Sequence, residues 1–434
     1  MKNREIGIGL LGLGTIAGQV ARVVKKRGLE LAEKTGFSLA LRKIKVLPID
    51  MTRPETKSMP FGLITTDENE FWNTPGIDVI VELIGGEHPA LEYQEKALAS
   101  GKHVVTANKE VIAKHGMELL DLAYSKNVFL RYEAAVGGGI PLIAPFERDL
   151  IVNRINRMYA IINGTTNYIL SRMSQESIDF KEALSQAQKL GYAEANPKND
   201  IEGVDAAYKL AILASLAFQS EVKPEQVFHE GISRLAAIDF RYANELGYAI
   251  KLLAIAKRTG EEIDARVHPA FIPIDSFLAK INGVFNAVLV DGDLTGEVTF
   301  TGKGAGPLPT SSAVIADLLT IGRDISASGL VSFLPRRINL HHSVMAMDDI
   351  NTRYYIRMSI SDQAGVLAQI AHILGSHDIS IASAIQKQSD KSNKAAEIVI
   401  MTHPAKENAV QRAFAEFNNL AVVKEISNFV RVED

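Results

Sequence analysis

The sequence predicts an α/β fold in three parts: a doubly wound parallel sheet, an α+β domain, and a small C-terminal unit with the element order βαββαβ. Strand-like and helical stretches alternate over 1–138, and long helical stretches followed by strand-like runs fill 139–330. A polar stretch, 331–352, is expected to be a linker to 353–434, which has strands and helices of its own.

The first part is predicted from regularly repeated apolar runs. Strands are expected at 5–10, 43–50, 77–84 and 102–107, and helices at 16–27, 89–100 and 110–126. Three basic residues followed by Gly28 mark the expected end of the first helix. Strands that alternate with helices in this way form a parallel sheet of the Rossmann type.

The second part begins with helices and ends with strands. Helices are expected at 165–174, 181–190 and 206–218, strands at 285–290 and 296–302, and a helix near 307–325 that packs back on the first part. The third part is expected to have strands at 354–360, 379–387, 395–402 and 421–430 and helices at 365–376 and 405–417. This is the order of a ferredoxin-like unit, which leaves one sheet face open for pairing in a dimer.

The composition limits the classes of partner. A formal net charge of −4, with 23% charged residues of both signs, gives no basic field, so neither nucleic acid nor a membrane surface is expected as a partner. The first residues lead directly into a strand and no apolar stretch approaches a membrane span, so a cytoplasmic chain without a leader or a preceding domain is expected. The absence of cysteine excludes thiolate catalysis and thiolate metal ligands.

The stretch GLGTIAG, residues 12–18, follows a strand and opens a helix. Gly12 permits a tight turn, Gly14 lets backbone amides approach a pyrophosphate, and Ala17 lets the helix pack closely on the sheet. The surrounding alternation of strands and helices favours a dinucleotide site over a purely structural glycine turn.

The choice between NAD and NADP stays open on these residues. The second strand is expected to end at Asp50, whose carboxylate would bond a ribose 2′-hydroxyl and favour NAD. Arg53 lies close enough in sequence to accept a 2′-phosphate and favour NADP.

A lysine stands in an otherwise apolar helix. In AAYKLAILASLAF, residues 206–218, only Lys209 and Ser215 are clearly polar, so the helix should be buried. Lys209 can pair with Asp205 at i,i+4, which is worth about 0.2–0.5 kcal/mol on an exposed helix. Alternatively it is a proton donor in the first helical turn, where burial and the helix dipole favour the neutral amine and Asp205 favours the ammonium.

Other polar residues stand where a ligand could reach them. Glu194 and Asp200 lie in the loop before the apolar helix, where they either serve the turn at Asn196 or hold an ammonium or hydroxyl group of a substrate. Lys109 follows a strand expected to end at Ala107, and open α/β sheets bind their ligands at this carboxyl edge.

These stretches together resemble the homoserine dehydrogenase family. The resemblance is carried by AQKLGYAEANPKNDIEGVDAAYK (187–209) and by ELIGG, TANKE, YEAAVGGGIP, INGTTNYIL and GKGAGPLPTSSAV, and it covers the first three quarters of the chain. Residues 361–381, SDQAGVLAQIAHILGSHDISI, resemble an ACT domain, which is an amino-acid-binding module. By this resemblance 353–434 is expected to be a regulatory module whose removal leaves catalysis intact.

The resemblance implies NAD(P)-dependent interconversion of L-aspartate 4-semialdehyde and L-homoserine, in the biosynthesis of threonine, methionine and isoleucine. Lys209 would give the proton to the aldehyde oxygen with Asp205 as its orienting partner, and Lys109 would lie between nicotinamide and substrate. Glu194 and Asp200 would hold the amino-acid end of the substrate.

The resemblance also implies further ligands and an assembly. The cofactor would touch Thr15, Ile16, Gly304 and Gly306 in addition to Gly12, Gly14 and Lys109. A structural monovalent cation such as sodium would be held by Glu133 and by the carbonyls of Val136, Gly138 and Ile140. A homodimer or homotetramer is expected, with threonine as the first effector to test.

Two other functions remain as alternatives. One is a related dehydrogenase that acts on another amino acid or a sugar. The other is a non-catalytic protein that senses an amino acid and binds a nucleotide. The presence of both Lys109 and Lys209 together with the carboxylates speaks against the second.

Overall fold

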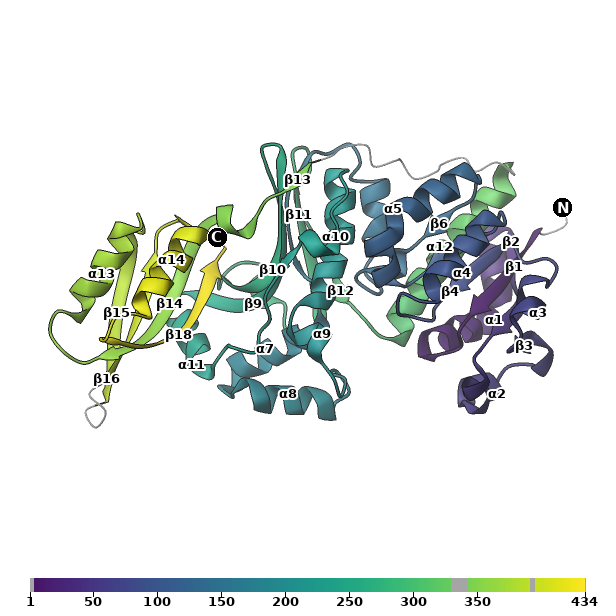
Figure 1. The fold of residues 1–434 in the computed structure, drawn as a ribbon. Helices are drawn as coiled ribbons and strands as arrows, with labels where there is room; N and C mark the ends of the chain where they lie inside the picture. The colour runs from purple at the N-terminus through teal and green to yellow at the C-terminus, as the bar shows by residue number, and fades with distance from the viewer. Residues whose placement is uncertain (1–3, 329–341, 391–394, 434) are drawn as a thin grey trace. The chain divides into compact units, whose positions relative to one another are not determined.

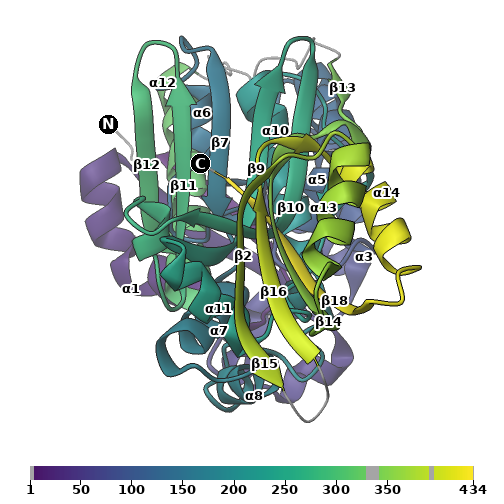
Figure 2. The same ribbon diagram turned by 90° about the vertical axis from the view of Figure 1, so that its left-hand side faces the viewer.

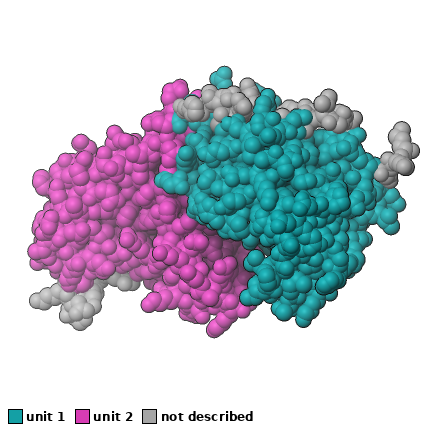
Figure 3. Space-filling model, turned by 45° about the vertical axis from the view of Figure 1, so that its right-hand side comes forward, with its two compact units in different colours: residues 1–156, 208–225, 290–342 teal, residues 157–207, 226–289, 343–434 magenta. Residues whose placement is uncertain are grey.

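The computed structural model describes residues 4–328, 342–390 and 395–433 (Figure 1). They form two compact units, which Figure 3 distinguishes by colour. The first unit contains 1–156, 208–225 and 290–342, and the second contains 157–207, 226–289 and 343–434. Each unit is therefore assembled from three separate stretches of the chain.

A parallel sheet forms the centre of the first unit, with the strand order β3-β2-β1-β4-β5-β6. Its strands are β1 (Arg4–Leu11), β2 (Phe37–Lys45), β3 (Ile64–Thr65), β4 (Val79–Glu82), β5 (His103–Thr106) and β6 (Leu130–Arg131). This order reverses direction between β1 and β4, and such a switch point is where doubly wound folds bind a dinucleotide. The predicted Rossmann-type sheet is confirmed.

Helices cover this sheet. The first unit contains α1 (Thr15–Thr35), α2 (Pro54–Lys57), α3 (Glu68–Trp72), α4 (Ala90–Ala99), α5 (Lys109–Ser125), α6 (Ile143–Glu147), most of α10 (Val204–Phe218) and α12 (Pro307–Ser328). Side chains of α12, among them Val314 and Leu318, share a hydrophobic core with β1 and α1. Gly322 allows this packing, because the ring of Phe37 occupies the space that a side chain at residue 322 would need.

Two predicted boundaries in the first unit are wrong. The first helix does not end at Gly28 but continues to Thr35, where Gly36 closes it in the left-handed conformation at φ 81°. A helix tolerates an internal glycine at a cost of about 1 kcal/mol, which packing of its inner face can offset. The second strand ends at Lys45 rather than Asp50, because Pro48 begins a short 3₁₀ helix, Pro48–Thr52.

A second sheet has the strand order β12-β11-β7-β9-β10-β18-β14-β16-β15, with β8, β13 and β17 attached beside it. The strands before the C-terminal unit are β7 (Ile155–Ile161), β8 (Phe228–His229), β9 (Tyr248–Thr259), β10 (Glu262–Pro273), β11 (Phe285–Gly292), β12 (Gly296–Lys303) and β13 (Ser343–Val344). The helices of the second unit before this point are α7 (Gly164–Glu176), α8 (Phe180–Lys189), α9 (Lys198–Ile201) and α11 (Ala237–Glu245).

The C-terminal part has the predicted βαββαβ order. Its elements are β14 (Asn351–Ser361), α13 (Val366–Ser376), β15 (Ile381–Asp390), β16 (Ala395–Thr402), β17 (Ala405–Lys406), α14 (Glu407–Phe417) and β18 (Val423–Val432). Figure 2 shows its four long strands side by side, with α13 and α14 next to each other on one face. Gly365 precedes α13 at φ 88°, a left-handed conformation that favours glycine.

The C-terminal strands continue the sheet of the second unit. β18 pairs in parallel with β10 through Ala270–Arg431 and Phe271–Val432, and the amide of Glu433 donates to the carbonyl of Phe271 at 2.8 Å. One sheet therefore runs through the C-terminal unit and into the rest of the second unit.

Buried charges cross the same junction. The carboxylate of Asp239 on α11, fully buried, accepts hydrogen bonds from Arg357 Nε at 2.7 Å, Asn428 Nδ2 at 2.7 Å and the hydroxyl of Tyr355 at 3.0 Å. Arg266 on β10 forms ion pairs with Asp264 and with Glu433. The C-terminal unit thus supplies partners to buried charges outside itself.

The predicted boundaries at 138, 330 and 352 stay predictions. The expected linker, 331–352, lies partly outside the described residues, and its described end contains β13 and a 3₁₀ turn, Met347–Asp349. Among the helices of the described ranges, none combines the length and the apolar character that crossing a bilayer requires.

Candidate active site

The glycine turn has the geometry that close approach of a ligand requires. Gly12, at φ 85°, follows β1 in a left-handed conformation, and a side chain there would come within 3.2 Å of the carbonyl of Leu83. Gly14 is the N-cap of α1, and there is open space around the position of its missing side chain. The first turn of α1 has no acidic residue, so its amides and dipole favour an anion such as a pyrophosphate.

The helix that the turn opens also follows the prediction. Thr15 begins α1 and is exposed, Ile16 is half-buried, and Ala17 lies in the core with strand β1. Asp50 and Arg53 lie beyond β2, and Arg53 Nε is 2.8 Å from Asp50 Oδ1. Both residues considered for the ribose end of the cofactor therefore form one ion pair.

A second glycine turn packs against the predicted cation loop. Gly304 follows β12, and Gly306, at φ 117°, precedes α12. A side chain at Gly138 would lie 2.6 Å from the carbonyl oxygen of Gly304, and one at Gly139 would lie 2.8 Å from Pro309. The two loops are in direct contact within the first unit, which the sequence spacing did not indicate.

A buried hydrogen-bond network fixes the start of α5, where Lys109 is the first residue. The carboxylate of Glu82 accepts from the amide of Ile84 at 2.7 Å and from the hydroxyl of Thr106 at 2.8 Å. Asn108 caps α5 by accepting from the amide of Val111 at 3.2 Å, and its Nδ2 donates to the carbonyl of Gly86 at 2.7 Å. The ELIGG and TANKE segments are thus joined, and Lys109 is placed at the carboxyl edge of the sheet as predicted.

Lys209 is buried, with 9% of its surface exposed, on a helix whose apolar residues belong to the core. One detail of the prediction is wrong. α10 begins at Val204, so Asp205 occupies the first turn and Lys209 is the sixth residue, in the second turn. The helix dipole falls off within the first turn, so it acts more strongly on Asp205 than on Lys209.

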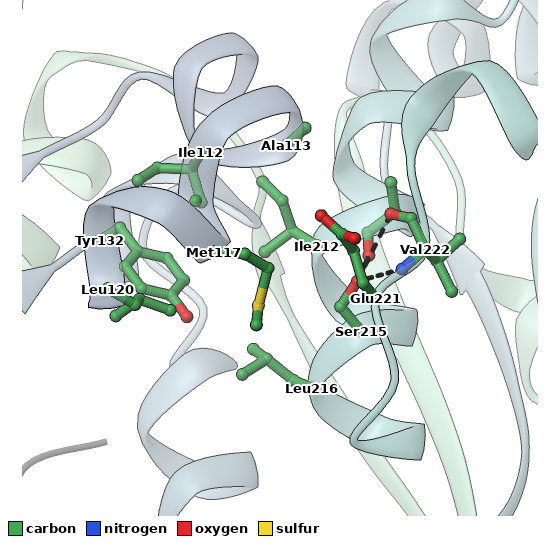
Figure 4. Close-up of a pocket in the computed structure, with 12 residues that line it drawn as sticks. Ile112, Ala113, Met117, Leu120, Tyr132, Ile212, Ser215, Leu216, Glu221 and Val222 are labelled. Carbon is green, nitrogen blue, oxygen red and sulfur yellow. Dashed lines mark hydrogen bonds between the residues drawn. The ribbon is translucent and has the colours of Figure 1, made fainter. Parts of the chain in front are cut away.

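Helices α5 and α10 face each other in the first unit. Ile112 and Met117 of α5 and Ile212 and Leu216 of α10 line a small cavity that Figure 4 shows. The ammonium of Lys114 lies 5.7 Å from the centre of the ring of Tyr208. The helices that carry Lys109 and Lys209 are therefore packed together through apolar side chains.

Asn163 brings two of the predicted carboxylates together. Its Nδ2 donates to Asp200 Oδ1 at 2.7 Å and to Asp205 Oδ2 at 2.8 Å. Its Oδ1 accepts from the amide of Thr166 at 2.8 Å, which caps α7. Sequence reasoning missed Asn163, although it quoted the INGTTNYIL stretch; an asparagine two residues before the helix expected at 165–174 was the available signal.

Glu194 is exposed in the loop between α8 and α9. Its carbonyl accepts from Gln188 Nε2 at 3.1 Å. This bond holds the loop backbone and leaves the role of the Glu194 carboxylate untested.

The buried carboxylate of Glu133 caps a helix. Its oxygens accept from the amides of Leu142 at 2.6 Å, Ile143 at 2.9 Å and Ala144 at 2.8 Å, at the start of α6. The amide of Glu133 in turn donates to Asp317 Oδ2 at 2.9 Å. Burial, followed by the charge of Glu133, raises the pKa of Asp317 well above its usual range.

The donor set around Glu133 is compatible with a monovalent cation. Glu147, which is half-buried, is paired with Arg131 at 2.6 Å, so three carboxylates in this region are matched by one guanidinium. Within the described ranges no three His, Asp or Glu side chains converge as they would around a metal ion. Backbone carbonyls of the 136–140 loop would therefore have to supply most of the ligands.

Fold and site together indicate an oxidoreductase with a nucleotide-binding sheet, a buried lysine one helical turn after Asp205, and a C-terminal βαββαβ unit. Family profiles described as "Homoserine dehydrogenase, NAD binding domain", "Homoserine dehydrogenase" and "ACT domain" match residues 12–133, 141–319 and 354–422. A homoserine dehydrogenase of Neisseria gonorrhoeae is 40% identical over 437 residues, which cover 99% of each chain. The chain belongs to the homoserine dehydrogenase family, and it is an oxidoreductase with an NAD-binding domain and an ACT domain.

Solved structures support the same family assignment. A homoserine dehydrogenase from Thiobacillus denitrificans superimposes with a TM-score of 0.92 at 40% identity, over 99% of each chain. A hyperthermophilic archaeal homoserine dehydrogenase in complex with NADPH matches with a TM-score of 0.62 at 25% identity, over 73% of this chain and 97% of that one.

Proposed function

We propose that Lys209 is the proton donor in the NAD(P)-dependent interconversion of L-aspartate 4-semialdehyde and L-homoserine. This reaction belongs to the biosynthesis of threonine, methionine and isoleucine. The observation that carries the proposal is a buried lysine one helical turn after Asp205, whose carboxylate is tied through Asn163 to Asp200. A buried amine near carboxylates can exchange a proton with a carbonyl or alcohol oxygen.

The bound nicotinamide would supply or accept the hydride. The residues of the chain supply the rest of the chemistry. Lys209 delivers a proton to the aldehyde oxygen, Asp205 orients it, and Lys109 lies against nicotinamide and substrate. Asp200 and Glu194 bind the ammonium end of the substrate, because carboxylates accept charge-assisted hydrogen bonds from an ammonium group.

For the cofactor, we propose contacts from the glycine turn, from Thr15 and Ile16, and from the Gly304–Gly306 turn. The open space at Gly14 and the uncharged first turn of α1 support a pyrophosphate there. The Asp50–Arg53 pair does not favour NAD over NADP or the reverse. Asp50 could bind the ribose 2′-hydroxyl of NAD, and Arg53 could bind the 2′-phosphate of NADP. Initial rates with NAD and NADP, in the wild type and in Arg53→Ala, test this point.

For the cation, we propose Glu133 and the carbonyls of Val136, Gly138 and Ile140 as ligands of a structural sodium or potassium ion. The excess of carboxyl groups over cationic side chains around Glu133 supports this. The midpoint of thermal unfolding should then be higher in sodium or potassium chloride than in tetramethylammonium chloride at the same ionic strength. Equal midpoints in the three salts would contradict it.

The ACT-domain match supports a homodimer or homotetramer, with threonine as an effector. The expected open face of the C-terminal sheet does not add to this support, because Tyr355 and Arg357 on that face are buried against Asp239 of α11. Light scattering coupled to size exclusion measures the assembly. Initial rates with and without threonine measure the response.

The assignment of Lys209 is tested by Lys209→Ala. Its kcat should fall by about 10²–10⁴-fold, the usual contribution of a positioned proton donor. The exposed Lys189→Ala is the matched control and should keep wild-type kcat. Glu194→Gln should instead raise KM for homoserine. A folded Lys209→Ala enzyme with wild-type kcat would remove the assignment.

A further inference from the structure

A second buried lysine lies in the second unit, on β9. Lys251 has 3% of its surface exposed, and it shares a face of its strand with Leu253 and Ile255, which belong to a hydrophobic core. Burial lowers the pKa of its ammonium from 10.5 to about 8. Because the folded chain lowers this pKa, the ammonium costs the fold free energy at neutral pH. Side chains that are unfavourable for stability in this way are expected at positions that serve function.

The hydrogen-bond partners of Lys251 among the described residues are three neutral oxygens. Its ammonium donates to the carbonyl of Ile281 at 2.5 Å, to Asn282 Oδ1 at 3.0 Å and to Asn167 Oδ1 at 3.4 Å. Ile281 and Asn282 belong to the segment 281–285, which leads into β11, and Asn167 belongs to α7. Lys251 therefore joins this segment to the helix.

Further hydrogen bonds hold the same segment on α7. Asn167 Nδ2 donates to the carbonyls of Ile281 at 3.2 Å and Phe285 at 3.0 Å. The amide of Gly283 donates to the hydroxyl of Ser171, also on α7, at 3.0 Å. The segment is thus bound to the helix at both of its ends and at its middle.

The segment also reaches the start of α7. A side chain at Gly164 would lie 3.0 Å from the carbonyl oxygen of Val284, so the first residue of the helix rests directly on the segment. Gly164 follows Asn163, whose Nδ2 donates to Asp200 and Asp205. The position of Asn163 therefore depends on where the segment lies.

We propose that Lys251 is a positioning residue for substrate binding. By holding the segment 281–285 against α7, it sets where Asn163 presents its amide and hence where the carboxylate of Asp200 lies. The inference rests on the proposed role of Asp200 in binding the ammonium end of the substrate. Lys251 acts through Asn163 and does not touch the substrate, so its effect is on binding rather than on the chemical step.

Lys251→Met tests the proposal, because it keeps a side chain of similar length and removes the charge and its donors. KM for homoserine should rise by about threefold or more, while kcat should stay within about twofold of the wild type. The urea midpoint at pH 7 should be unchanged or higher, since a buried charge is gone. The carbonyl of Ile281 still has a donor in Asn167, which helps the variant to fold.

Lys280→Met is the matched control, because Lys280 is an exposed lysine directly before the same segment. It should keep the wild-type KM and urea midpoint. An unchanged KM in Lys251→Met would overturn the proposal. A KM that rises together with a lower urea midpoint would do the same, because the lysine would then be a general support of the fold.

Hydrogen–deuterium exchange gives a second measurement that does not depend on activity. The amides of 281–286 and 163–167 should exchange faster in Lys251→Met than in the wild type, and those of the first unit should not change. Unchanged exchange at 163–167 would mean that Lys251 does not fix the start of α7, which rules the proposal out. A wild-type enzyme inactive on homoserine would instead remove the proposed function, and exchange would still decide whether Lys251 holds α7.

Discussion

Two regions of the second unit hold carboxylates in different ways. Asp200 and Asp205 share a neutral donor, the amide of Asn163. Asp239, Glu407 and Glu433, at the junction with the C-terminal part, are paired with the guanidinium groups of Arg357, Arg431 and Arg266. An amide donor brings no charge to a carboxylate, whereas a guanidinium neutralises it. The first arrangement suits a binding site and the second suits a structural joint.

The largest expected effect follows from removing the C-terminal part, which contributes to the arginine–carboxylate pairs at this junction. We call these pairs, Asp239–Arg357, Glu407–Arg431 and Glu433–Arg266, the joint. The sequence predicted a module that could be removed without harm to catalysis. The structure gives this module a strand of the shared sheet and the partners of Asp239 and Arg266. We therefore expect a chain shortened to residue 340 to lose cooperative unfolding of the second unit, measured by urea denaturation. A shortened chain with wild-type stability and activity would restore the prediction of a removable module.

A single substitution should have a smaller effect of the same kind. Arg266→Leu leaves the buried carboxylates of Asp264 and Glu433 without their shared cation. Breaking a buried pair from one side costs about 3–5 kcal/mol in the free energy of unfolding. The exposed Arg258→Ala should cost less than about 0.5 kcal/mol. Equal urea midpoints for the two variants would mean that the arginine does not stabilise the joint.

The joint should also weaken as pH falls. His268 is fully buried, its Nε2 accepts from Arg266 Nε at 3.0 Å, and its pKa is lowered well below 6.5 by burial and then by Arg431. The folded chain therefore keeps this imidazole neutral, while the unfolded chain takes up a proton below pH 6.5. Stability is complete above that pH and falls below it by at most about 1.4 kcal/mol per pH unit.

Urea midpoints between pH 7.5 and 5 measure this loss, and His268→Gln provides the comparison. The slope between about pH 6.5 and 5 should be shallower in the variant, because one proton-binding group is gone. Glu407 and Glu433 contribute only at lower pH. Burial opposes their ionisation, but arginine partners hold the pKa of each below its usual range. Parallel pH profiles for the two proteins would assign the loss to other groups.

The smallest stability effect and the clearest functional one are expected at Asn163. Asn163→Ser keeps an N-cap for α7, so the free energy of unfolding should change by less than about 1 kcal/mol. The hydroxyl cannot donate to Asp200 and Asp205 together, so KM for homoserine should rise by about tenfold or more. Asn163→Ala should show the same rise in KM with a further loss of about 1 kcal/mol from the missing cap. An unchanged KM in both variants would mean that Asn163 does not position the carboxylates.

The sequence predicted what depends on local pattern. The glycine turn, the buried Lys209 and the βαββαβ order were read from short stretches, and each was found. Three features could not be read in this way. The continuation of α1 through Gly28 depends on packing, the bridge by Asn163 joins residues about forty positions apart, and the pairing of β10 with β18 joins still more distant segments. Each depends on tertiary contacts that periodicity does not encode.

The shared sheet has a consequence for synthesis of the chain. β10 is translated well before β18, so the backbone groups of Ala270 and Phe271 that pair with β18 have no such partner while the intervening residues are made. An unpaired edge next to a buried phenylalanine can bind another chain in the same state. If folding starts at the N-terminus, the edge of β10 therefore stays unpaired and prone to aggregation until β18 has been synthesised. A ribosome pause before β18 would lengthen the time for which this edge is exposed.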